Sequence, residues 1–188
     1  MAAKGQKLTV EEKMKFIETQ TEETALSALR ELTLKNGCEY SCAIGPDGKV
    51  LDLVEGGKDE NGRDVVRVPE IVDKAEPNSI ILCHSHPDNT CFSIDDLNIL
   101  CGYTAIKEMR VIGKNGKTYT LSVGEGKRPT ADDLANTYKS IGADIYKPIG
   151  MKLEAKEITW EDAMAQLSIG IVERMVDECK WIKRWPTP

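Results

Sequence analysis

The chain lacks any long hydrophobic run and any excess of positive charge. No stretch of its 188 residues approaches the ~20 apolar residues that a membrane-spanning helix needs. Its 25 lysines and arginines stand against 31 aspartates and glutamates, a net charge of −6. This balance argues against general nucleic-acid binding, which needs a basic face. Because the first ten residues also lack the apolar core of a signal peptide, we expect a cytoplasmic protein with no membrane contact.

Paired Cys-x-x-Cys motifs are also missing, although the chain contains six cysteines. Their absence excludes the common zinc frameworks built from four cysteines. In a reducing compartment the thiols are expected to stay reduced. We therefore interpret most of the cysteines as small buried side chains.

The irregular alternation of strand-like and helix-like segments predicts one α/β (α+β) domain over residues 1–188, with a mixed β-sheet flanked by helices. The length suffices for one domain with a proper core. We divide the chain into an N-terminal helix (1–36), a core that contains the candidate metal site (37–128) and C-terminal helices (129–188). No internal repeat or low-complexity tract interrupts this order.

Capping residues and apolar stripes predict the terminal helices. The capping box Thr9-Val-Glu-Glu begins the first helix, and Asn36-Gly37 ends it. A second helix is predicted from Thr130 to Gly142, and a third begins at Thr159 with an apolar stripe that continues to Ile182. These stripes are compatible with packing on the core or with self-association.

The core is predicted to contain two hairpins with a buried strand between them. Asn-Gly and Gly-Pro-Asp-Gly are turn sequences, and a continuous apolar run suits a central strand covered on both faces. The predicted strands are Cys38–Ile44 with Lys49–Val54, the apolar run Ser79–Cys83, and Met109–Gly113 with Lys117–Val123.

The only two histidines of the chain, His84 and His86, follow directly after this apolar run. Side chains at positions i and i+2 of a strand point to the same side. Both imidazoles can therefore face one metal ion. A catalytic zinc site has three protein ligands and a water, so a third ligand is expected nearby.

Asp96 is our candidate for the third ligand. It closes the sequence Ser-Ile-Asp-Asp, which has the form of a helix cap beginning at Ser93. Asp96 would then lie in the first helical turn and reach the ion if the preceding loop folds back. Asp95, about 100° round the helix, and Cys91, in the loop, are the alternatives. Capping without any metal also explains these four residues.

The sequence His-Ser-His-Pro from His84, followed by Ser-x-x-Asp from Ser93, resembles the signature of JAMM (MPN+, JAB-domain) zinc metallopeptidases. That signature is an upstream Glu, then His-x-His-Pro, then Ser-x-x-Asp. The loop between the two motifs is one residue shorter than in most eukaryotic members, and is similar to that of bacterial or phage-type domains. The resemblance implies a JAMM/MPN (cytidine-deaminase-like) fold and a Zn²⁺ ion held by His84, His86 and Asp96.

The resemblance also implies a catalytic glutamate in or before an early strand. Glu39 fits this position, and Glu55 is the second choice. Its carboxylate would take a proton from the attacking water and later pass one to the leaving amine. Ser93 would hydrogen-bond the oxyanion, and because a hydroxyl can donate one bond while accepting another, this role is compatible with capping.

Together these residues predict a zinc-dependent hydrolase of peptide or isopeptide bonds. The resemblance suggests a protein or peptide substrate, such as the tail of a ubiquitin-like protein. Two other classes remain: a non-catalytic MPN-like scaffold or interaction module, and a RadC-like DNA-associated protein. The acidic composition argues against the second.

Overall fold

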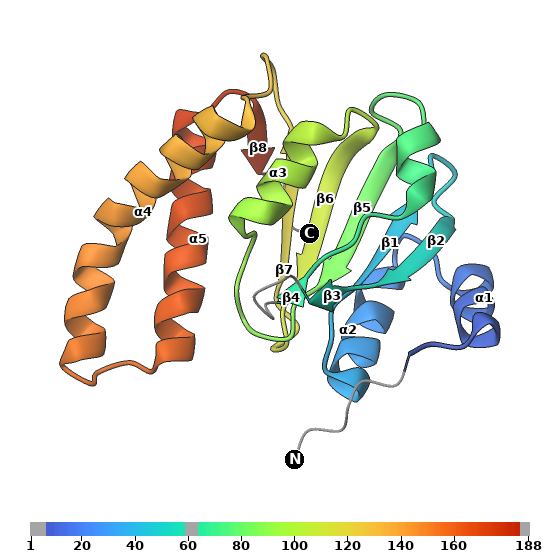
Figure 1. The fold of residues 1–188 in the computed structure, drawn as a ribbon, viewed down its shortest axis with the longest axis horizontal. Coiled ribbons are helices and arrows are strands. Elements are labelled where there is room, and N and C mark those ends of the chain that lie inside the picture. Colours follow the sequence, from blue (N-terminus) through green and yellow to red (C-terminus); the bar gives the residue numbers. More distant parts are fainter. Residues whose placement is uncertain (1–6, 59–63, 185–188) are drawn as a thin grey trace.

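The computed structural model describes residues 7–58 and 64–184. It shows a mixed α/β fold in which helices flank a six-stranded sheet (Figure 1). Within the described part of the chain, no helix combines the length and the apolar character needed to cross a bilayer. The helices are α1 (Val10–Thr19), α2 (Ala25–Asn36), the short 3-10 helix η1 (Glu70–Lys74), α3 (Ile94–Gly102), α4 (Ala131–Glu154) and α5 (Trp160–Glu178).

The large sheet has the strand order β2-β1-β5-β6-β7-β8. Strands β5 and β6 are parallel, whereas the other neighbours are antiparallel. Every residue of β5 is buried, and both hairpins are present, as the sequence predicted. The strands are β1 (Tyr40–Ile44), β2 (Val50–Glu55), β5 (Ile80–Ser85), β6 (Ile106–Ile112), β7 (Thr118–Val123) and β8 (Ile182–Arg184), with β3 (Gly57–Lys58) and β4 (Asp64–Val65) in a separate two-stranded sheet.

Each face of the large sheet packs against its own set of helices (Figure 1). The cluster around Leu29 and Cys42 joins α1 and α2 to one face. The cluster around Ala43, Leu97 and Met175 joins α3, α4 and α5 to the other. Neighbouring residues of β1 thus enter opposite cores, as strand alternation requires. The central strands are therefore covered on both sides.

The predicted single N-terminal helix is wrong, because two helices are present. α1 ends at Thr19 and α2 begins at Ala25. Between them Thr21 forms a β-bridge with Lys49, and its amide donates to the Thr24 hydroxyl at 3.0 Å. Threonine hydroxyls compete with helical hydrogen bonds in this way. The linker is therefore fixed by the β1–β2 turn.

The C-terminal helices also differ from the prediction. Gly142 does not end a helix, since α4 continues through it to Glu154. A Cβ atom at Gly142 would lie 3.2 Å from Ile171 Cδ1, and one at Gly170 would lie 2.9 Å from Ile145 Cγ2. Both glycines therefore serve the close packing of α4 on α5. The predicted stripe is likewise too long, because α5 ends at Glu178 and Ile182 lies in β8.

We predict that Leu29→Ala lowers the free energy of unfolding by about 2–5 kcal/mol, because it leaves a cavity between α2 and the sheet. Leu29 is fully buried, whereas Leu34 of the same helix is 49% exposed. Leu34→Ala is therefore the matched control, with an expected loss below about 0.5 kcal/mol. Urea denaturation measures both, and equal losses would contradict the packing of α2 described here.

Candidate metal centre

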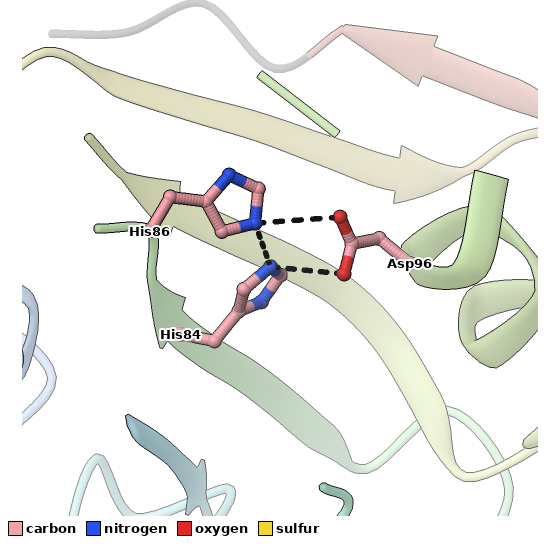
Figure 2. Close-up of side chains that lie close together, drawn as sticks. All are labelled: His84, His86 and Asp96. Carbon is pink, nitrogen blue, oxygen red and sulfur yellow. Dashed lines mark hydrogen bonds and ion pairs between the residues drawn. The ribbon is translucent and has the colours of Figure 1, made fainter. Parts of the chain in front are cut away.

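Two neighbouring elements supply the three side chains of the candidate metal centre. His84 lies near the end of β5, and His86 follows its last residue. The amide of His86 still donates to Ile112 O of β6 at 2.9 Å, so the backbone stays extended. Both imidazoles therefore point to the same side of the sheet. Asp96 lies in the first turn of α3 and faces them. Figure 2 shows the three side chains pointing toward one another.

The distances within this group fit one small cation. The two Nε2 atoms lie 3.1 Å apart. His84 Nε2 is 3.1 Å from Asp96 Oδ1, and His86 Nε2 is 3.5 Å from Asp96 Oδ2. Tetrahedral ligands at zinc bond lengths stand roughly 3.3–3.4 Å apart. The three residues are at most 5% exposed, and together they could hold a metal ion.

The capping box of α3 fixes Asp96. The Ser93 hydroxyl accepts from Asp96 N at 3.1 Å. In return Asp96 Oδ2 accepts from Ser93 N at 2.7 Å and from the Ser93 hydroxyl at 2.8 Å. The predicted cap is therefore present. The hydrogen bonds that the Asp96 carboxylate accepts in the cap both go to Oδ2. The other oxygen, Oδ1, makes no capping bond and faces His84.

Thr90 orients His86, and the sequence did not indicate this role. His86 Nδ1 lies 3.1 Å from the Thr90 hydroxyl and 3.3 Å from its carbonyl oxygen. The same hydroxyl donates to Asp88 Oδ1 at 2.5 Å, so it accepts the proton of Nδ1. When the ring of His86 is neutral, its lone pair is therefore on Nε2 and faces the centre, as a metal ligand requires.

The protonation states of these three side chains also favour the binding of a cation. Burial lowers the pKa of His84. Burial acts likewise on His86, but the hydrogen bond and charge of Asp96, together with more distant carboxylates, outweigh it and raise the pKa of His86 to about 9. Burial would raise the pKa of Asp96, yet the two histidines hold it well below its usual range. A proton on His86 thus balances the buried carboxylate, and a metal ion would replace that proton.

The two alternative ligands lie outside the group. Asp95 is exposed on the first turn of α3. Cys91 is buried, and its sulfur is not among the candidate ligand atoms of the described residues. Burial raises the pKa of its thiol to about 12, which keeps it protonated and disfavours a thiolate ligand.

Glu39 lies at the cavity beside the candidate centre. It is half-buried and directly precedes β1, which begins at Tyr40, two residues later than the predicted strand Cys38–Ile44. Glu55 pairs with Tyr40 in the β1–β2 ladder and does not line this cavity. The cavity, of about 280 Å³, is lined by Glu39, Val65, Val66, His86, Pro87, Asp88, Thr90, Ser93, Asp95 and Asp96.

Comparison of the chain with models of protein families, with curated proteins and with solved structures found no significant match. Any function of the chain is therefore inferred from the side chains of the site itself. Two imidazoles and one carboxylate suit several divalent first-row metals. The buried group is consistent with a metal ion, and its donor atoms alone do not select zinc.

We predict that Asp96→Ala weakens zinc binding by more than ~100-fold, beyond the loss typical of an outer-shell residue. Asp95→Ala should leave the affinity unchanged, because this carboxylate is exposed. Asp162→Ala removes the equivalent capping carboxylate from α5 and controls for the loss of a helix cap. Competition with a chromophoric chelator measures the affinities. Equal values for the Asp95 and Asp96 variants would contradict the ligand assignment.

For Thr90→Val we predict a 10–100-fold loss of zinc affinity, because His86 Nδ1 loses its hydroxyl partner and keeps only the more distant Thr90 carbonyl at 3.3 Å. Thr90→Ser keeps the hydroxyl and should bind zinc like the unmodified protein. The same competition assay measures both. Unchanged affinity in Thr90→Val would show that the His86 ring is held in another way.

Proposed function

We propose that this protein is a zinc-dependent hydrolase of peptide or isopeptide bonds, similar in its chemistry to the JAMM (MPN+) metallopeptidases. One observation carries the proposal. The buried group of His84, His86 and Asp96 adjoins a cavity that is also lined by Glu39 and Ser93. Side chains for metal binding, proton transfer and oxyanion stabilisation thus lie beside one space that a substrate can enter.

The choice of zinc is supported by the number and type of the donors. Catalytic zinc sites combine three protein ligands with an open position, and two histidines with one carboxylate are a known set. The candidate group supplies these three ligands. A zinc ion bound there would act as a Lewis acid and lower the pKa of its water ligand.

Glu39 is the proposed proton carrier. Its side chain lines the cavity, and its negative charge contributes to the raised pKa of His86. The carboxylate accepts a proton from the attacking water and then donates one to the leaving amine. Glu39 is half-buried, so its carboxylate remains accessible from the cavity.

Ser93 is the proposed donor to the oxyanion. Its hydroxyl proton points to Asp96 Oδ2 in the structure. When negative charge develops on the substrate oxygen, the hydroxyl rotates its proton toward that charge. Asp96 stays in place during this rotation, because Oδ2 still accepts from the Ser93 amide at 2.7 Å. Because Oδ2 accepts two hydrogen bonds from Ser93, the hydroxyl can break its bond during this step while the amide keeps its own.

We predict that Glu39→Gln binds zinc normally but loses roughly 10²–10⁴-fold in kcat, because only proton transfer is removed. Glu55→Gln is the matched control and should retain activity, since Glu55 does not line the cavity. Peptide-linked and isopeptide-linked protein conjugates serve as substrates, with and without a chelator.

Retained turnover in Glu39→Gln would show that another carboxylate is the base. Zinc-loaded protein that cleaves none of the conjugates would contradict the proposed hydrolase, as would cleavage that a chelator does not abolish.

A further inference from the structure

Ser85 lies between the two candidate metal ligands, and its side chain points to the opposite face of the sheet. It is the last residue of β5 and is fully buried. Because alternate residues of a strand face opposite sides, Ser85 points toward α2. There its hydroxyl lies 2.5 Å from the hydroxyl of Thr33.

The Ser85 hydroxyl also contacts the start of β1. Tyr40 N donates to Ser85 Oγ at 3.2 Å. The last paired positions of the β1–β5 ladder are Ser41 and His84, so Tyr40 lies one residue beyond the ladder. A buried amide must find an acceptor, and here a side chain of β5 provides it.

The peptide unit between Glu39 and Tyr40 is thereby held at both ends. A peptide bond is planar, so the carbonyl of Glu39 and the amide of Tyr40 move together. The amide donates to Ser85 Oγ, and the carbonyl accepts from Gly56 N at 2.7 Å. A Cβ atom at Gly56 would lie 3.0 Å from both Glu39 Cβ and Glu39 O, so this approach needs glycine. The orientation of Glu39 is therefore set by its neighbours on two sides.

We infer that Ser85 is a positioning residue, whose hydroxyl clamps the peptide unit of Glu39 to the strand that carries His84 and His86. The clamp keeps the Glu39 carboxylate at a fixed position relative to the metal centre. Thr33 of α2 holds the Ser85 hydroxyl in place. The catalytic consequence of this clamp rests on the proposed function. The clamp itself does not, because it is made by hydrogen bonds that exist without any substrate.

Ser85→Ala tests the inference on the zinc-loaded protein. We expect the Tyr40 amide to exchange its hydrogen at least about 10-fold faster, because its acceptor is lost. Zinc affinity should change less than about threefold, since both histidines remain. The kcat should fall about 10–100-fold with KM nearly unchanged, because a small displacement of a catalytic group is costly.

Ser122→Ala is the matched control. Ser122 is another buried strand serine, and its Oγ has no hydrogen-bond partner among the described residues. This variant should change neither the exchange of Tyr40 nor kcat. Ser85→Cys keeps a side chain of similar size with a weaker acceptor, and it should accelerate the exchange of Tyr40 even if the alanine variant does not fold.

The outcomes separate this inference from the proposed function. Unchanged exchange of Tyr40 in the Ser85 variants overturns the clamp whether or not the protein is a hydrolase. In an active protein, faster exchange with unaltered kcat overturns the positioning role. If the unmodified protein cleaves no conjugate, the hydrolase proposal fails, and the exchange of Tyr40 still decides whether the clamp exists.

Discussion

The buried carboxylate of Asp96 is the constraint on which the candidate centre depends. A charge that is only 2% exposed is costly unless it is paired and hydrogen-bonded. Asp96 meets this requirement on two sides, through the cap of α3 and through the imidazoles of His84 and His86. The same contacts join the start of α3 to the end of β5. A helix cap and a candidate cation site are therefore one arrangement.

The loop between these elements is held by parts of the chain that are distant in sequence. Asp88 O accepts from Lys114 N at 2.7 Å, so the β6–β7 turn supports one side. On the other side, two residues of α5 accept hydrogen bonds from the loop. Glu161 Oε1 accepts from Asn89 Nδ2 at 3.0 Å, and Ser168 Oγ accepts from Cys91 N at 2.9 Å. The α4–α5 hairpin thus supports the loop that orients His86. α5 is therefore a structural part of the site rather than a separate addition.

Features that depend on local pattern were predictable from the sequence. The buried strand β5, both hairpins and the cap at Ser93 each follow from a few consecutive residues. Features that depend on tertiary contacts were not. The break before α2 requires pairing of Thr21 with Lys49, and the helix continues through Gly142 because α5 approaches there.

The residues of the candidate site also fall into those that a local pattern predicted and one that depends on tertiary contacts. Spacing along one strand placed His84 and His86 on one side, and a cap placed Asp96 in the first turn of a helix. The role of Thr90 appears only when the loop folds and brings its hydroxyl to the His86 ring. A threonine four residues after a histidine is too common a pattern to indicate this contact.

X-ray absorption at the zinc edge, on protein loaded with one equivalent of zinc, tests the central claim most directly. We predict one tightly bound zinc per chain, with only nitrogen and oxygen neighbours at about 2.0–2.2 Å and scattering from two imidazoles. A sulfur neighbour at about 2.3 Å, fewer than two imidazoles, or no stoichiometric binding would contradict it.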